Sequence, residues 1–423
     1  MKIFIFFKIL FFISFNFIYA NELTEVLKSA NNYTVKIDVS TEYPFIEDGY
    51  GGSGTGILIN KEKGLIATNK HVATSSKSII KVNFKSSDLV DAKQVYIDPH
   101  LDFAILQIDP EEIPDFAEKA NLGCDFDIEI GSNVVAFGHP YSQDFTATRG
   151  IVSGQRYETG VNFESIQTDA PINPGNSGGA LIDLDTNVVI GMNTYGLDTE
   201  GLNFATPSKL FCTIIDLFER DIDPSPAILD LHFASNDRID VHLKVSKNKG
   251  NYDFQISDII KKVDNVDVSN PSQLIDQLRG KKQSILTVLR KDEEIEIEVN
   301  DLNKISPITE RKGLLVSEIL ISNKYTSSNS DLSEEFWNHD NNLVIQSIGF
   351  GTSTNIFKFY DRILLVDNQS INDLDELFDY LQDKEEVDIL VERSRRYDGK
   401  TMIVNYFDTL KVEDVQMISP SDD

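Results

Sequence analysis

One serine lies in a sequence suited to nucleophilic chemistry. Ser177 is preceded by Gly175-Asn176 and followed by Gly178-Gly179, and glycine permits the sharp backbone bend that leaves a hydroxyl open. The segment Gly175-Asn176-Ser177 is our candidate oxyanion hole, because the N–H groups of Gly175 and Ser177 can converge on one point. A serine hydroxyl is a weak nucleophile by itself, so the loop needs a base and an orienting acid from elsewhere.

Both partners are found upstream of the serine. His71 follows the apolar run Gly64–Ala67, and Asp102 opens the run Leu101–Leu106. Ser177 would attack a carbonyl, His71 would carry the proton, and Asp102 would orient the imidazole. Taken alone, Asp102 fits a turn or cap, His71 fits a structural role, and the glycine loop fits a hairpin turn. The order His71, Asp102, Ser177 is that of chymotrypsin-like proteases and favours catalysis.

The segments around these residues resemble those of the HtrA/DegP family of trypsin-like serine proteases. They are Gly52–Gly56, Thr68–Val72, Asp102–Leu106, Gly138–Pro140, Thr148–Ser153, Thr168–Leu181 and Phe204–Ser208. The resemblance implies a double β-barrel protease that cleaves unfolded or damaged proteins, assembles from trimers and carries C-terminal PDZ domains.

The local pattern agrees with a mainly β chain. From Tyr33 to Thr206, short β-rich runs alternate with Gly, Asn, Asp and Pro, which is typical of a barrel or sandwich. Apolar residues at helical spacing predict a helix over Ser208–Asp221, followed by a linker at Asp221–Pro226. Together with this pattern, the resemblance implies a mainly β chain: a chymotrypsin-like double β-barrel protease followed by two PDZ-like α+β domains.

The remainder contains an internal repeat. Asp258–Asn265 aligns without gaps to Asp361–Asn368, and the offset of 103 residues continues through Leu278 and Leu381. The resulting division is a signal peptide at 1–20, a protease domain at 21–222, PDZ-like domains at 225–300 and 308–410, and an acidic tail at 411–423.

PDZ domains add an extended peptide to a sheet edge and hold its carboxylate in a glycine-containing loop. The first repeat departs from this pattern, because it offers Ile228–Leu231 with Asp230, which should repel a carboxylate. Gly313–Val316 of the second repeat is the better candidate. The alternative is that the units only pack against or space the protease. The polar insert Asn323–Asn342 holds the single tryptophan, Trp337.

The net charge and the amino-terminal sequence indicate which partners and which cellular compartment to expect. The 423 residues include 68 acidic and 39 basic ones, a formal charge of −29 without a basic cluster, so no nucleic-acid partner is expected. Residues 1–20 have a positive start, an apolar core and a small residue at Ala20, which predicts export with cleavage there. We expect a periplasmic protein with no stable membrane span after signal removal.

The chain has two cysteines, Cys124 and Cys212, and an oxidising compartment permits a bridge between them. Because Cys124 falls in a loop and Cys212 in a helix, two free thiols are the interpretation we favour. No His/Cys spacing is that of a metal site, and neither metal nor cofactor is expected.

An acid at the base of the S1 pocket of trypsin-like proteases selects Arg or Lys, and Pro171 takes that position here. With Ile172, Met192, Asn193 and Thr194 as the expected pocket, this predicts cleavage after small or medium aliphatic residues. The function that follows is ATP-independent degradation of misfolded or damaged exported proteins by a homo-trimer or a larger assembly. The alternatives are a chaperone or scaffold with its protease normally off, and a processing protease for one client.

Overall fold

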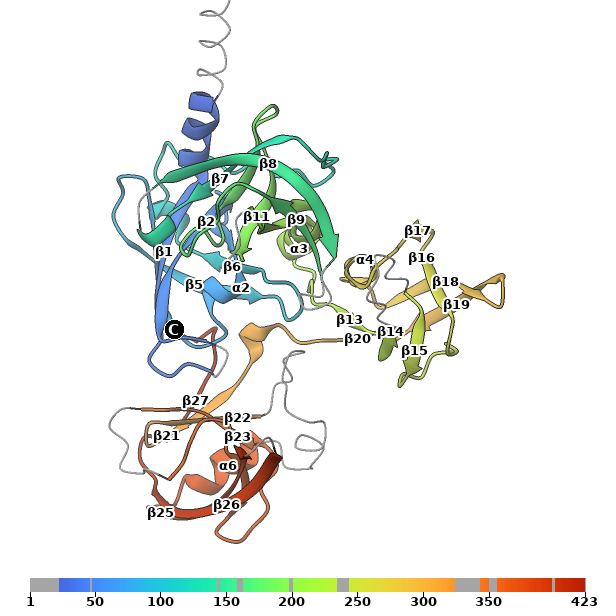
Figure 1. Cartoon of the computed structure of the whole chain (residues 1–423). Helices are drawn as coiled ribbons and strands as arrows, with labels where there is room; N and C mark the ends of the chain where they lie inside the picture. The colour runs from blue at the N-terminus through green and yellow to red at the C-terminus, as the bar shows by residue number, and fades with distance from the viewer. Residues whose placement is uncertain are drawn as a thin grey trace, which may run out of the picture.

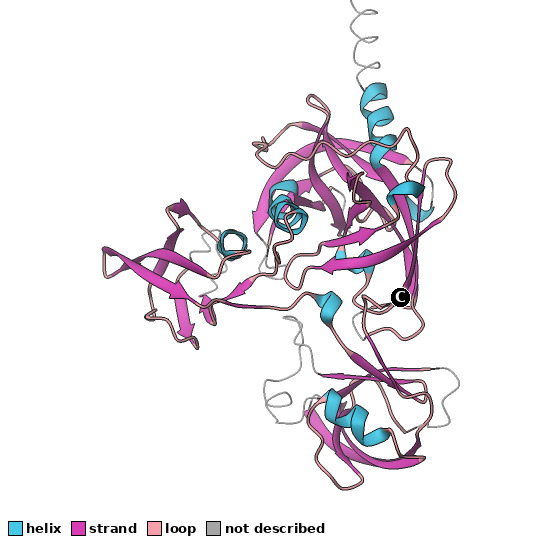
Figure 2. Cartoon of the chain, turned by 180° about the vertical axis from the view of Figure 1, so that it is seen from behind, coloured by secondary structure: helices cyan, strands magenta, loops and turns pink. Residues whose placement is uncertain are grey.

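The computed structural model describes residues 23–45, 48–142, 145–157, 163–197, 201–233, 243–323, 343–349, 356–397 and 400–422. The predicted signal peptide and Trp337 lie outside them. Figure 1 shows a large β-rich body with two smaller units below and beside it. Strands dominate all three parts, and Figure 2 shows the few helices among them.

The first half of the large body is a closed six-stranded barrel. Residues 23–33 form a helix before it. The strands run in the order β1-β2-β3-β6-β5-β4. They are β1 (Thr34–Ser40), β2 (Gly51–Asn60), β3 (Leu65–Thr68), β4 (Ile79–Phe84), β5 (Val90–Ile97) and β6 (Ala104–Gln107). Alternate residues of β1, namely Val35, Ile37 and Val39, face the core, as the two-residue period of a strand requires.

The second half is another closed six-stranded barrel, with the order β10-β11-β12-β9-β8-β7. Its strands are β7 (Asn133–Gly138), β8 (Thr146–Tyr157), β9 (Glu164–Thr168), β10 (Ala180–Asp183), β11 (Val188–Gly196) and β12 (Asn203–Pro207). Short helical turns lie at α2 (Lys70–Ala73), η1 (Pro110–Glu112) and η2 (Pro140–Ser142). The expected double barrel is therefore present.

Helix α3 (Ser208–Glu219) ends the protease body, and its prediction is confirmed. Leu210, Phe211 and Ile214 are buried on one face. The ring of Phe211 stacks on that of Phe103 from the first barrel, with 5.4 Å between centroids. The helix thus joins both barrels in one hydrophobic core.

A disulfide joins Cys124 to Cys212 across 88 residues of sequence. The expectation of two free thiols was wrong. Cys124 lies before the second barrel and Cys212 lies in α3 after it, so the bond encloses all six strands of that barrel. The enclosed segment includes Ser177.

The first C-terminal unit is built around the four-stranded sheet β17-β16-β18-β19. Its elements are β13 (Ala227–Ile228), β14 (Leu231–Phe233), β15 (Val245–Asn248), β16 (Ile259–Val263), β17 (Val266–Asp267), α4 (Pro271–Leu278), β18 (Gln283–Arg290), β19 (Glu293–Asn300) and β20 (Asn303–Lys304). Leu274 and Leu278 of α4 pack into its core.

The second unit has a seven-stranded sheet in the order β26-β25-β24-β23-β22-β21-β27. After η3 (Ile308–Glu310) come β21 (Gly313–Val316), β22 (Ile319–Asn323), β23 (Leu343–Ile348), β24 (Arg362–Val366), α6 (Leu374–Leu381), β25 (Glu386–Tyr397), β26 (Lys400–Lys411) and β27 (Gln416–Ile418). The segment that we set apart as an acidic tail is therefore not separate, because β27 pairs with β21.

The 103-residue repeat has a physical counterpart in both units. Asp258 is paired with Arg290, and the corresponding Asp361 is paired with Arg393. Each pair joins the loop before the first repeated strand to the strand after the helix. Both helices begin at equivalent side-chain caps, Asn270 for α4 and Asp373 for α6, which satisfy an N–H of the first turn.

The second unit also contacts the protease body. Phe45, in the loop between β1 and β2, forms a small hydrophobic cluster with Leu320 and Ile418. The guanidinium of Arg311 lies 4.0 Å from the centre of the Phe45 ring. Phe45 is 1% exposed and is thus buried within the chain.

Candidate active site

Strand pairing in the first barrel brings His71 and Asp102 together. β3 pairs with β6 so that Thr68 lies opposite Ala104. The residues after β3 and those before β6 are therefore neighbours. Asp102 accepts from His71 Nδ1 at 2.8 Å through Oδ2 and from the His71 backbone N–H at 3.0 Å through Oδ1. Asn69 donates from Nδ2 to the Asp102 carbonyl at 3.0 Å.

This geometry shifts the pKa values of both His71 and Asp102. Partial burial lowers the pKa of His71, but the charge and hydrogen bond of Asp102 outweigh it and raise that pKa above its ordinary value. Burial alone would raise the pKa of Asp102, yet His71 and its hydrogen bonds hold it below the usual range. Asp102 therefore stays ionised and fixes the imidazole with its second nitrogen, Nε2, as the acceptor.

Ser177 lies between β9 and β10 on a loop that only glycine can form. Gly175 has φ +102° and Gly178 has φ +84°, in the region that residues with a Cβ rarely adopt. A Cβ on Gly178 would lie 2.0 Å from the carbonyl oxygen of Thr55. The glycines are thus required both by backbone conformation and by the close approach of β2.

Thr55 of β2 pins this loop to the first barrel. Its Oγ1 donates to the Gly175 carbonyl at 2.7 Å, and its N–H donates to the Ser177 carbonyl at 2.8 Å. The same hydroxyl accepts from the His139 backbone N–H at 3.1 Å. Thr55 is fully buried. The nucleophile loop and the barrel that carries His71 and Asp102 are therefore held in one register.

The Ser177 hydroxyl points to the second barrel. Its Oγ donates to the Thr194 carbonyl of β11 at 3.0 Å. Within the described residues no hydrogen bond joins it to His71. The acid and base are thus already paired, whereas the nucleophile is held by a backbone carbonyl. For attack, the hydroxyl has to leave that carbonyl and donate to Nε2 of His71.

The three candidate oxyanion-hole residues differ in whether their backbone N–H already donates a hydrogen bond. In the described part of the chain, the N–H groups of Gly175 and Ser177 have no acceptor, so both can receive an oxyanion. The Asn176 N–H donates to the Asn173 carbonyl at 2.9 Å. Asn176 is therefore not a donor to substrate in this conformation. Its N–H closes the turn that brings the other two together.

The residues that we expected to line the substrate pocket differ in how exposed they are. Pro171 is exposed and Ile172 is buried. Met192 belongs to the core of the protease body, and the Asn193 amide donates to the Ala180 carbonyl at 3.1 Å. Both are fully buried, so they do not line an open pocket. Thr194 contributes the carbonyl that holds Ser177.

Two residues that sequence reasoning missed lie beside Ile172. The Ile172 N–H donates to Oδ1 of Asn203 at 3.1 Å. A Cβ on Gly196 would lie 2.7 Å from the same Oδ1 and 2.8 Å from the Ile172 carbonyl oxygen. Pairing of β11 with β12 places Gly196 opposite Asn203. These contacts join the loop that holds Ile172 to β11 and β12, which lie 24 to 31 residues further along the chain, and no local signal marked them.

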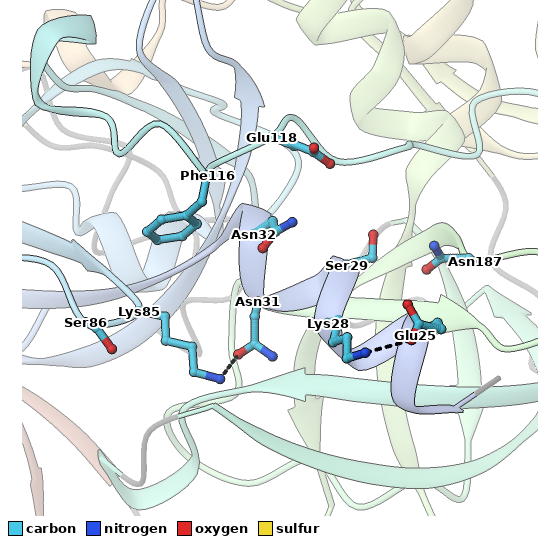
Figure 3. A pocket seen from close by; sticks show the side chains of 10 residues that line it. All are labelled: Glu25, Lys28, Ser29, Asn31, Asn32, Lys85, Ser86, Phe116, Glu118 and Asn187. Atoms are coloured by element: carbon cyan, nitrogen blue, oxygen red, sulfur yellow. Dashed lines mark hydrogen bonds and ion pairs between the residues drawn. The ribbon is translucent and has the colours of Figure 1, made fainter. Parts of the chain in front are cut away.

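Elsewhere, a cavity of about 800 Å³ lies beside the N-terminal helix. Polar side chains from that helix and from neighbouring loops line it, among them Lys28, Asn31 and Glu118 (Figure 3). None of His71, Asp102 and Ser177 borders it. The described residues contain no group of three or more His, Cys, Asp or Glu side chains placed to hold a metal ion, and none of their helices is long and apolar enough to span a membrane.

The two barrels, with His71, Asp102 and Ser177 contributed from both, define a trypsin-like serine peptidase domain. A family model described as a trypsin-like peptidase domain matches residues 54–192. The Serine protease Do-like HtrA of Bacillus subtilis is 40% identical over 179 residues, which cover 38% of each chain. The peptidase domain of this chain is thus similar to those of HtrA/DegP serine proteases.

Other relatives extend the comparison. The Periplasmic serine endoprotease DegP of Escherichia coli K12 is 37% identical over 185 residues, 40% of this chain and 38% of its own length. The chloroplastic Protease Do-like 1 of Arabidopsis thaliana is 32% identical over 281 residues, 59% of this chain and 63% of its own. The chain thus spans 38 to 63% of these curated relatives.

A solved structure titled HtrA-type protease AlgW with tripeptide shares the fold. It aligns with a TM-score of 0.55 and 23% identity over 68% of this chain and 98% of its own. The alignment extends beyond the protease body, because 68% of the chain is more than the residues up to the end of that body at residue 219.

Proposed function

We propose that the protein is an ATP-independent serine endopeptidase that degrades misfolded or damaged exported proteins. The observation that carries the proposal is the hydrogen-bonded His71–Asp102 pair beside a Ser177 loop that presents two N–H groups without an acceptor in the described chain. This set of groups matches what acyl transfer requires: a nucleophile, a base oriented by a carboxylate, and oxyanion donors.

The residues would act in sequence. Ser177 Oγ attacks the scissile carbonyl as His71 Nε2 takes its proton. Asp102 stabilises the imidazolium, while the N–H groups of Gly175 and Ser177 donate to the oxyanion. His71 then protonates the leaving amine, and water hydrolyses the acyl-enzyme by the same route in reverse.

For specificity, we propose cleavage after small or medium aliphatic residues. Pro171, Ile172, Gly196 and Asn203 offer no carboxylate to a basic side chain. A pocket without charge discriminates weakly, because one methylene is worth about 1–3 kcal/mol. Profiling of cleavage sites in an unfolded substrate tests this, and a preference for Arg or Lys would refute it.

The setting we propose is the periplasm, with unfolded chains as clients and a homo-trimer as the basic assembly. The apolar leader at residues 1–20 and the disulfide between Cys124 and Cys212 support export to an oxidising compartment. Native mass measurement tests the assembly, and a monomer at working concentration would contradict it.

The hydrogen bond from Ser177 to the Thr194 carbonyl favours a second candidate, a chaperone or scaffold whose protease is normally off. Incubation with unfolded casein, beside Ser177→Ala, separates the two. We expect wild type to cleave casein and to react with a fluorophosphonate probe, and the variant to do neither. If wild type stays as inert as the variant at every temperature and with every added peptide, the protease proposal fails. Cleavage of one partner but not of casein would indicate a dedicated processing protease.

A further inference from the structure

The loop that carries Asp102 is organised by a second aspartate. Asp98 directly follows β5, and its Oδ1 accepts from the backbone N–H groups of His100 and Leu101. Its own N–H donates to the Phe103 carbonyl at 2.9 Å. The loop 98–103 is therefore closed on both sides of Asp102 by contacts of Asp98. Asp98 itself is fully buried.

The cation that balances Asp98 comes from another part of the chain. Arg279, directly after α4 of the first C-terminal unit, donates to Asp98 through Nη1 at 2.6 Å and Nη2 at 3.2 Å. Nη1 also donates to the Pro224 carbonyl in the linker at 2.7 Å. The Arg279 side chain is 3% exposed and that of Asp98 is 0%. Tyr96 completes the site with a hydroxyl 2.7 Å from Oδ2 of Asp98.

The electrostatics make this contact indispensable to the loop. Burial would raise the pKa of Asp98, but the guanidinium of Arg279 and the hydrogen bonds hold that pKa below its usual range. Without Arg279, Asp98 would be an uncompensated buried charge, and such charges are relieved by protonation or by movement. Either response weakens the contacts that close the loop around Asp102.

The rest of the unit docks through the same helix. Asn270 and Gln273 donate to Oε1 of Glu164 on β9 at 2.8 and 2.9 Å. Thr213 of α3 donates to Asp276 at 3.2 Å. Helix α4 thus lies against the protease body, and Figure 1 shows it on the side that faces α3.

The internal repeat shows that the second unit has its fold without an equivalent of Arg279. Its equivalent in the second unit, 103 residues later, is Gln382, which is exposed. The ion pair that recurs in both units is instead Arg290–Asp258 and Arg393–Asp361, in which the aspartate is buried. Arg279 is therefore specific to the docked unit and to its contact with the protease.

We propose that Arg279 is a positioning residue for catalysis: the docked first unit holds, through Asp98, the loop that presents Asp102 to His71. The inference rests on the proposed protease activity. It predicts that loss of the contact lowers turnover without loss of substrate affinity, because substrate meets neither Arg279 nor Asp98.

The test compares two arginines of the same unit, each paired with a buried aspartate, in the full chain. Arg279→Met removes the contact with the protease, and Arg290→Met removes the matched pair inside the same unit. For Arg279→Met we expect kcat to fall roughly tenfold or more with KM little changed, as for other misplacements of catalytic groups. The acidic limb of its pH–rate profile should move down, because the Asp102 contact raises the pKa of His71. Arg279→Lys should recover part of the loss.

For Arg290→Met we expect a lower melting temperature but wild-type kcat and pH profile in the folded protein. Wild-type kcat and acidic limb in folded Arg279→Met would overturn the proposal, as would equal losses in both variants. Hydrogen exchange gives a readout that does not need activity. The N–H groups of His100 and Leu101 should lose protection in Arg279→Met alone. If wild type is inactive, the protease proposal fails, and exchange still decides whether Arg279 holds the loop.

Discussion

Thr55→Val tests whether one buried hydroxyl holds the nucleophile loop in register. The hydroxyl donates to the Gly175 carbonyl at 2.7 Å and accepts from the His139 N–H at 3.1 Å. Valine keeps the shape but removes both bonds, together with the 3.2 Å contact between the hydroxyl and Nδ1 of His139. Each buried group left without its partner costs about 1–3 kcal/mol. We therefore expect the free energy of unfolding to fall by about 2–6 kcal/mol.

The effect on catalysis follows from where those bonds lie. Gly175 supplies one oxyanion donor, and loss of a whole donor lowers kcat by about 10²–10³. Thr55→Val leaves the donor in place but frees the adjoining peptide, so we expect a fall in kcat of about 10- to 100-fold. Thr55→Ser keeps the hydroxyl and should retain most of the activity.

The assay combines denaturant unfolding with kcat and KM on a chromogenic peptide, at a temperature where every variant is folded. Thr34→Val is the matched control. Thr34 is fully buried in the same barrel, and its hydroxyl has no hydrogen-bond partner among the residues that the structure describes. It should lose neither stability nor turnover. Wild-type kcat in folded Thr55→Val would refute the reasoning that this hydroxyl positions the loop.

Two further predictions concern pH and redox state. Because Asp102 raises the pKa of His71, the acidic limb of kcat/KM should lie above the ordinary value of about 6.5. His71 stays protonated, and cannot act as a base, up to that higher pH. Asp102→Asn should move the limb down and lower kcat by about 10⁴-fold; a limb that stays in place would contradict the assignment. Replacement of Cys124 and Cys212 by Ser removes the closure of an 88-residue loop and should lower stability by about 4–5 kcal/mol, measured by denaturant unfolding with and without reductant. Equal stability of the oxidised and reduced wild type would contradict this.

Local sequence carried the parts of the site that depend on residue type. The glycines around Ser177 and the order of His71, Asp102 and Ser177 were readable because backbone freedom and chemistry restrict those positions. Helix α3 was readable because its buried face follows helical spacing. The 103-residue offset was readable because caps and ion pairs recur with it.

The contacts that escaped prediction join distant segments. Arg279 and Asp98 are 181 residues apart in sequence, and the two cysteines are 88 apart. Whether such groups meet depends on how the helices and strands pack against one another, and the local spacing of apolar residues does not determine that packing. The assignment of Asn176 to the oxyanion hole failed for a different reason. The Asn176 N–H donates to the Asn173 carbonyl and so points into a turn. Residue type alone does not determine where a backbone N–H points.

Strand β27 covers an edge of β21 in the second unit, where a peptide could otherwise add to the sheet. Both edges of β21 are occupied, one by β22 and the other by β27. A peptide that adds to the sheet at Gly313–Val316 must displace a strand of the same molecule, tethered through residues 412–415. A tether this short gives an effective concentration on the order of millimolar or more, and apparent peptide affinity falls with the fraction of open edges. Any peptide that bound at this edge would therefore have to compete with β27 of the same chain.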